Sequence, residues 1–344
     1  MINLFINSLF GSTLKRPSLI SIIFSYTMLI FWSLVCLFPL YWIIVTSFKT
    51  LPTYTNGPFY LPFYDFEGSL SAWETILNDN ETYVAFLNSL FISFVSSTIA
   101  LILGSMAGYA IARITYRPKL GSIILFILTL FITVYIILQF NISWELPTIC
   151  GIIIFIILLS SLNTRFKTQL NNEDISFWII STRVLPPVTI VLPIYVLFQQ
   201  IGILKSHWSL IIAYSTGAIP IAIWLMKEFF VKIPVELEES AIIDGATRYR
   251  IWWSIILPLV KPGLAATYII TLISTWNEYL FALFLSTSKT QTLPMHVAGQ
   301  LTVKGTQWWS MSVVIIIMLI PVLFIAVFLQ RFVLSGLLSG SVKG

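Results

Sequence analysis

Long apolar runs separated by short polar stretches dominate the pattern of this chain. Most runs are long enough to form a helix of about 20 residues, the length that crosses a hydrocarbon layer of about 30 Å. The pattern predicts eight membrane-spanning helices, at about residues 18–47, 84–112, 121–140, 148–163, 177–200, 207–227, 264–286 and 309–333. Because the runs continue along the whole chain, we do not expect the first to be a removable signal peptide. The expected fold is an all-α, polytopic membrane helix bundle.

The composition supports a membrane protein. Of 344 residues, 58% are hydrophobic and 10% are charged, whereas soluble domains contain about 45–50% apolar and about 25% charged residues. A water-soluble fold of this size could not bury so much apolar surface. We therefore expect the lipid bilayer as the surroundings of this chain, and the net charge of +5 does not indicate a nucleic-acid partner.

The positions of the basic residues predict the orientation, because cytoplasmic loops are enriched in lysine and arginine. With the N-terminus in the cytoplasm, 15 of the 19 basic residues lie inside. The four outside are Lys49, Lys205, Lys289 and Lys304. The opposite topology would reverse that ratio. We therefore expect both termini in the cytoplasm.

Residues that carry chemistry in enzymes are few and scattered. Cys36 and Cys150 lie in apolar runs, where we expect small buried hydrophobic side chains, and His207 and His296 lie alone in expected loops. The sequence has no metal-ligand spacing, no nucleophile–base pair and no GxxxxGK[ST] motif for nucleotide binding. We expect no catalytic activity, no metal and no cofactor in this chain.

The longest charged segment of the second half, residues 228–263, is typical of two short helices around a glycine. Pro234 suits a first helical turn, and Gly245 can adopt the left-handed conformation that ends a helix. A second, amphipathic helix should follow and end at Pro258. Its apolar face is formed by Ile251, Trp252, Ile255 and Ile256. That face could enter the groove of a partner or pack beneath the chain's own helix bundle.

This segment resembles the EAA loop of ABC importer permeases. The matching residues are Glu239, Ser240, Ala241, Asp244, Gly245, Ala246, Ile256, Leu257, Pro258, Pro262 and Gly263. Ser240 departs from the usual alanine but is also small. In that family the loop is a coupling helix that docks into a cleft of the ATPase subunit. The resemblance therefore implies an ATPase-coupling loop from Glu239 to Pro258.

Three other stretches resemble the carbohydrate-uptake, MalG-like branch of the family, namely 181–187, 276–280 and 330–344. The C-terminal tail of that branch reaches into the ATPase dimer. The same contact is implied here for Gly340, Ser341, Val342, Lys343 and Gly344. The resemblance implies a MetI-like type I permease core in a bacterial plasma (inner) membrane. Its implied partners are an ATP-binding cassette ATPase dimer, which binds the ATP, a second MalF-like permease subunit and an extracytoplasmic solute-binding protein.

The resemblance does not extend over residues 120–170. Relatives of that branch typically have six spans, so the two runs at about 120–165 resemble an inserted hairpin. An even number of extra spans leaves the topology of the flanking spans unchanged. The predicted organisation is an N-terminal tail, first span and external loop at 1–83, a transmembrane domain at 84–333, and a cytoplasmic tail at 334–344.

Polar residues within the predicted spans are candidates for a translocation path. These are Arg183, Trp276, Asn277 and Glu278. A carboxylate such as Glu278 is costly inside a membrane, so a functional role is the default interpretation. Asn277 and Glu278 could bind sugar hydroxyls, or they could fasten their helix to the partner permease. Arg183 precedes two prolines that could open a cavity, or it could serve only as a cytoplasmic anchor.

Gly104 and Gly108 form a small-xxx-small pair, which we interpret as a helix-packing device. The polar stretch at 49–83 should face outward, where it could contact a solute-binding protein or simply be solvated.

The sequence thus predicts a permease subunit of an ABC importer for a sugar, disaccharide or polyol, powered by a separate ATPase. The alternative is a stand-alone, ion-coupled secondary transporter in which Glu278 is a proton or sodium site. Such carriers often have two repeated halves, and this sequence shows no internal repeat.

Overall fold

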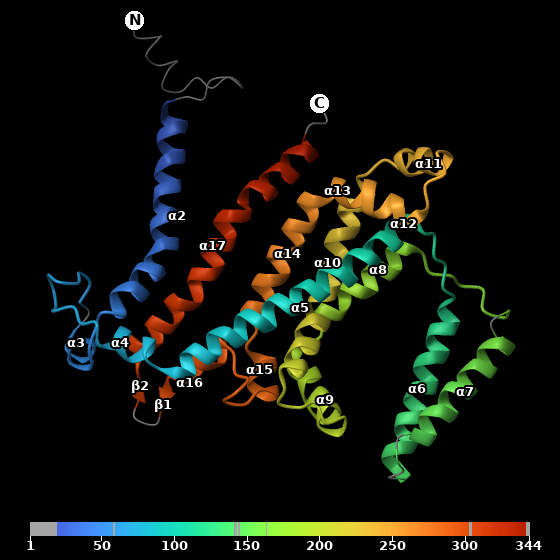
Figure 1. Cartoon of the computed structure of the whole chain (residues 1–344), viewed down its shortest axis with the longest axis horizontal. Helices are drawn as coiled ribbons and strands as arrows, with labels where there is room; N and C mark the ends of the chain where they lie inside the picture. The colour runs from blue at the N-terminus through green and yellow to red at the C-terminus, as the bar shows by residue number, and fades with distance from the viewer. Residues whose placement is uncertain are drawn as a thin grey trace, which may run out of the picture. The chain divides into compact units, whose positions relative to one another are not determined.

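The computed structural model describes residues 19–57, 59–140, 143, 145–162, 164–302 and 305–341. This part of the chain is almost entirely helical (Figure 1). Its only strands are the two-residue antiparallel pair β1 (Leu301–Thr302) and β2 (Gly305–Thr306). The predicted all-α class is confirmed. The chain divides into a first compact unit, up to Ser89 with Thr287–Phe324, and a second unit, Leu90–Ser286 with the residues from Ile325 onward.

Six helices of the described chain are long and apolar enough to cross a membrane. They are α2 (Leu19–Thr46), α5 (Asn80–Arg113), α6 (Leu120–Phe140), α7 (Glu145–Leu162), α10 (His207–Val231) and α17 (Trp308–Ser341). Two sharply bent groups of helices reach the same length and apolarity when each is taken as one span. The predicted bundle of about eight spans is therefore confirmed.

The first bent group falls where a single span was predicted at 177–200. Helix α8 (Asn172–Ser181) continues into a short 3₁₀ turn, η1 (Thr182–Val184), and meets α9 (Pro187–Gln200) at 87°. The cause is the Pro186-Pro187 pair. Leu185 is extended, with ψ 126°, as expected of a residue before proline, and Pro187 occupies the first turn of α9.

The span predicted at 264–286 is wrong as one helix. Helix α14 (Lys261–Trp276) ends at Asn277, and a short helix, α15 (Leu280–Leu285), follows. Polar side chains stabilise the break, because the Glu278 carboxylate accepts a hydrogen bond from the Phe281 N–H at 3.2 Å. It thereby satisfies an N–H group that has no partner within its own helix.

Helix α10 forms the centre of the second unit, packing against α14, α15 and α8. Helix α5 approaches α10 closely at Gly104 and Gly108. A Cβ atom at Gly108 would lie 2.9 Å from the Lys227 backbone nitrogen, and one at Gly104 would overlap Ala222. The predicted packing role of this glycine pair is confirmed.

Helices α6 and α7 form a hairpin that packs chiefly on itself, drawn in green at the right of Figure 1. None of the side chains in the most apolar stretch of either helix is buried. Two hydrogen bonds join the segments that enter and leave the hairpin, from the Leu120 N–H to the Thr168 carbonyl at 3.0 Å and from the Leu170 N–H to the Pro118 carbonyl at 2.9 Å. We call this pairing the neck of the hairpin.

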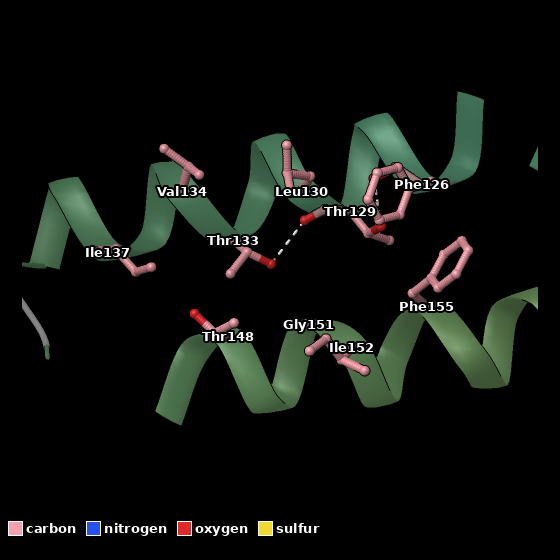
Figure 2. Close-up of a pocket in the computed structure, with 10 residues that line it drawn as sticks. All are labelled: Phe126, Thr129, Leu130, Thr133, Val134, Ile137, Thr148, Gly151, Ile152 and Phe155. Carbon is pink, nitrogen blue, oxygen red and sulfur yellow. Dashed lines mark hydrogen bonds between the residues drawn. The ribbon is translucent and has the colours of Figure 1, made fainter. Parts of the chain in front are cut away.

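The interface between α6 and α7 is centred on Thr133 and Gly151. Figure 2 shows both residues at a cavity of about 140 Å³ between the helices. A Cβ atom at Gly151 would overlap the Thr133 hydroxyl, so glycine permits the close approach of the helices. Cys150 on α7 and Cys36 on α2 are exposed. The expectation that they are buried is wrong, because both helices present almost all side chains to their surroundings.

The first unit contains α2, the start of α5, and the short helices α3 (Leu51–Thr55), α4 (Ser71–Leu77) and α16 (Leu293–Gly299). Lys49 is only 1% exposed and lies with its Nζ 4.3 Å from the centre of the Trp42 ring. Burial lowers the pKa of Lys49. This cation–π contact attaches the segment after α2 to the helix itself.

His296 is buried in the first unit, and the expectation that it lies alone is wrong. Its Nε2 atom is 2.8 Å from the Thr82 hydroxyl and 3.6 Å from an Asp79 carboxylate oxygen. Burial lowers the pKa of His296, although the Asp79 charge opposes the shift. In the second unit, the His207 ring packs edge-on against Phe91.

Candidate functional site

The predicted coupling loop forms four short helical elements, which we call the coupling segment. They are α11 (Glu236–Ile243), α12 (Arg248–Ile251), the π-helical turn η2 (Trp252–Ile256) and α13 (Leu257–Leu259). Acidic residues occupy the first turn of α11, as predicted. Pro234 lies before the helix rather than in its first turn, because α11 begins two residues later, and the Pro234 carbonyl accepts from the Leu237 N–H at 3.4 Å.

Gly245 ends α11 in the left-handed conformation that was predicted, with φ +78°. Its N–H donates to the Ile242 carbonyl, and the N–H of Ala246 donates to the Ala241 carbonyl, both at 2.9 Å. These bonds satisfy carbonyls at the end of the helix and turn the chain toward α12. Any side chain at Gly245 would be strained by the backbone conformation, although the space around it is open.

Pro258 does not end the second helix, contrary to the prediction. The preceding π-helical turn shifts the hydrogen bonding, so that the Leu257 N–H donates to the Trp252 carbonyl five residues earlier. Pro258 then occupies the first turn of α13, where a missing N–H costs little. The bend comes after Leu259, where the axis turns by 75° into α14.

One face of the coupling segment packs into the chain's own bundle. Its buried apolar cluster consists of Met226, Phe230, Ile233, Ala241, Ile251, Ile256 and Val260. Ile256 is fully buried and Ile251 nearly so, against residues of α10. Of the two alternatives for the apolar face of the second helix, packing beneath the bundle is therefore correct for these isoleucines.

Away from this cluster, most side chains of the coupling segment are exposed. Its exposed large apolar residues are Leu237, Ile242, Ile243, Tyr249, Trp253 and Leu259. Ile243 is 86% exposed and Tyr249 74% exposed. Glu239, Ser240, Asp244, Arg248 and Arg250 are also exposed. A surface segment that exposes several large apolar side chains is a candidate for binding another protein.

Glu238, which sequence reasoning passed over in favour of Glu239, is the buried acid of the coupling segment. It forms an ion pair with Arg113 at the end of α5, and the two side chains are 11% and 10% exposed. The Tyr109 hydroxyl donates to the same carboxylate at 2.6 Å. Helical spacing could have indicated this arrangement, because Glu238 lies three residues before the buried Ala241 and so on the same face of α11.

The structure brings together two of the four candidates for the translocation path. Arg183 and Glu278 line one cavity of about 50 Å³. An Arg183 guanidinium N–H donates to the Gly217 carbonyl in the middle of α10 at 2.7 Å. The Tyr214 hydroxyl donates to the Glu278 main-chain carbonyl at 3.0 Å. The breaks at Leu185 and after Trp276 therefore both border this cavity, which we call the α9–α14 cavity.

The other two candidates lie elsewhere. Trp276 is buried and does not line the cavity, while Asn277 is exposed and its amide donates to the Ile273 carbonyl at 2.9 Å.

At the C-terminus, Gly340 and Ser341 belong to the end of α17. Val342, Lys343 and Gly344 lie outside the described residues.

Comparison with known proteins gives matches over most of this chain. Residues 173–338 match the family described as "Binding-protein-dependent transport system inner membrane component". The chain is 32% identical to a "Putative ABC transporter permease protein ORF1" of Streptomyces antibioticus, over 48% of this chain and 73% of that protein. It is 26% identical to the "Trehalose/maltose transport system permease protein MalG" of Thermococcus litoralis, over 91% of this chain and 93% of that protein.

The fold is similar to that of a chain in a solved structure of a bacterial ABC transporter "involved in the import of the acidic polysaccharide alginate". The similarity covers 91% of this chain and 96% of the other, with a TM-score of 0.58 and 19% sequence identity.

Proposed function

Because the chain belongs to the family of binding-protein-dependent transport system inner membrane components, the permeases of ABC transporters, we propose that it helps to carry a carbohydrate across a plasma membrane. The names of similar proteins support the cargo, since one is a trehalose/maltose permease and another belongs to an alginate importer. Both cargoes are carbohydrates.

The two-faced coupling segment is the observation that carries the proposal. Its buried face is fixed to the bundle, and its exposed face offers Ile243 and Tyr249 to a partner. We assign that exposed face to the ATPase subunit, with Glu239 and the turn at Gly245 as the contact. ATP is then bound by the partner, and its hydrolysis moves the coupling segment together with α10 and α14. This assignment requires the coupling segment, both termini and the tail Gly340–Gly344 to lie in the cytoplasm, as the distribution of lysine and arginine predicts.

The α9–α14 cavity is the proposed wall of the passage. Carbohydrates are rich in hydroxyl groups, which donate and accept hydrogen bonds, and the cavity offers the Arg183 guanidinium, the Tyr214 hydroxyl and the Glu278 carboxylate. A second, MalF-like permease would complete the passage, and a solute-binding protein would deliver the cargo from outside. Breaks in membrane helices border such passages because polar backbone is tolerated only where it lines a cavity or protein.

Reconstituted transport tests the function directly. The chain is incorporated into liposomes with its partner permease and ATPase, and labelled trehalose, maltose and polyols are offered with the solute-binding protein. We expect uptake that requires ATP on the ATPase side and every partner. Uptake by this chain alone, driven by a proton or sodium gradient, would instead establish the secondary transporter.

Replacement of Glu278 by alanine tests the passage. A role in the passage predicts that uptake falls about tenfold while the complex still assembles, a loss of one charged hydrogen bond. A role in fastening the two permeases predicts that the complex separates during size-exclusion chromatography. Normal uptake with normal assembly would exclude both roles.

A further inference from the structure

We propose that Glu238 is the positioning residue through which the coupling segment moves α5, so that import depends on its ion pair with Arg113. This inference rests on the proposed function, since it assigns the path of motion inside the same permease. It concerns a buried residue that faces the bundle, whereas the proposed ATPase contact is made by the exposed face of the segment.

Arg113 contacts the chain on both sides of the start of α11. Its Nε atom pairs with the Glu238 carboxylate at 2.5 Å, and its Nη2 atom donates to the Ile233 carbonyl at 2.9 Å. Ile233 follows the end of α10, and Glu238 lies in the first turn of α11. One guanidinium therefore bridges α5, the end of α10 and the coupling segment. The planar, five-donor arginine fork suits such a bridge, which a lysine ammonium could not reproduce.

Tyr109 adds a second attachment on the same face of α5, because it lies four residues before Arg113. Its hydroxyl donates to Glu238, and its ring packs edge-on against Trp252 of η2 and Phe230 of α10, with ring centres 4.7 Å and 5.4 Å apart. The end of α5 thus contacts both halves of the coupling segment. A rotation of α11 that kept these contacts would have to carry α5 with it.

Helix α5 is suited to transmit such a displacement. It has no proline from Asn80 to Arg113, and 34 helical residues extend about 50 Å. Its close approach to α10 at Gly104 and Gly108 keeps it in register with the helix that borders the α9–α14 cavity. A displacement of Glu238 is therefore transmitted to α5, which packs against α10 beside the proposed passage.

A second ion pair of the same unit provides a matched control. Lys227 of α10 is buried and pairs with Glu173 at the start of α8, both Glu173 carboxylate oxygens lying 2.8 Å from Nζ. Glu173 itself is 79% exposed and lies outside the coupling segment. Loss of this pair removes an acidic partner from a buried cation, as loss of the Glu238 pair does, without touching the coupling segment.

The test compares Glu238→Gln with Glu173→Gln in the complete importer reconstituted in liposomes. The quantity measured is the number of ATP molecules hydrolysed per solute molecule imported. We expect Glu238→Gln to raise this ratio about tenfold, through the loss of one charge-assisted interaction, with the ATPase still bound and active. The control should keep the wild-type ratio. The double variant Arg113→Glu with Glu238→Arg, which restores opposite charges, should recover part of the lost import.

A wild-type ratio in Glu238→Gln would overturn the inference, and so would an equal rise in Glu173→Gln. If Glu238→Gln fails to assemble, Arg113→Lys is measured instead, because lysine keeps the positive charge but cannot bridge Glu238 and the Ile233 carbonyl as arginine does. A raised ratio in assembled Arg113→Lys supports the inference, and an unchanged ratio overturns it. Failure of the proposed function is distinct, because the wild-type complex would then show no ATP-dependent import.

Discussion

The coupling segment and the α6–α7 hairpin are attached to the bundle in opposite ways. The coupling segment inserts Ile251 and Ile256 into a buried cluster and fixes Glu238 to α5. The hairpin packs chiefly on itself and joins the rest of the chain through its neck. Only an element with contacts into the bundle can transmit a displacement to it. From this difference in attachment we expect motion to pass through the coupling segment and not through the hairpin.

The largest effect is expected from Gly245→Pro in the coupling segment. Proline cannot adopt φ +78° and lacks the N–H that donates to the Ile242 carbonyl. A cost of about 3 kcal/mol at this bend corresponds to a loss of about two orders of magnitude. We expect import to fall to background while the protein still inserts, as measured by uptake and by membrane extraction. Normal import would contradict the coupling assignment.

A smaller effect, on the free energy of unfolding, is expected when one isoleucine of the coupling segment or of the hairpin is replaced by alanine. Ile256→Ala leaves a cavity in the buried cluster and should lower the free energy of unfolding by about 2–5 kcal/mol. Ile132→Ala in α6 removes a side chain that is 54% exposed and should change it by less than about 0.5 kcal/mol. Unfolding in detergent measures both. Equal losses would show that the hairpin is as well packed as the coupling segment.

Removal of the hairpin should have less effect still on transport. Residues 119–169 are replaced by a short Gly-Ser linker, which can connect the chain because the ends of this stretch are paired at the neck. Loop-closure entropy changes by only about 0.6 kcal/mol for a twofold change in loop length. We expect ATP-dependent import within about twofold of wild type. A complex that assembles but does not import would show that the hairpin has a role in the cycle.

The smallest effect on import is expected from Gly151→Val in α7. The added side chain overlaps the Thr133 hydroxyl and must separate α6 from α7 locally, at a cost of about 1–3 kcal/mol within the hairpin. Import should remain at the wild-type rate, while cross-linking between the two helices should decrease. Thr148→Val, at the edge of the same cavity, serves as the control that adds no overlap.

The positions of the spans were predictable from the sequence, but only some of their interruptions were. Apolar runs of about 20 residues indicate helices that cross a membrane, but they do not show where a helix bends. The break before Pro186 was indicated by proline, yet Pro258 sits in a continuing helix because a π-helical turn precedes it. Average hydrophobicity over about 20 residues predicts a span. The position of a bend depends on the hydrogen bonds of single backbone N–H and carbonyl groups, which such an average does not show.

The coupling segment shows the same division. The left-handed Gly245 was predictable, since only the local backbone decides it. The choice between Glu238 and Glu239 did not follow from the family motif, because a motif indicates which residues resemble a family and not which side chain faces inward; helical spacing relative to Ala241 was the better signal. For the candidate path, sequence indicated Arg183 and Glu278 separately. Only the folded chain brings them to one cavity, since their helices are about 95 residues apart in sequence.

The neck gives this chain a practical property. Because the segments that enter and leave the hairpin already pair at Lys119 and Gln169, a rigid soluble domain can be grafted there without displacing the flanking helices. The grafted domain would help to align particle images in electron microscopy, because most of this chain lies within the detergent micelle.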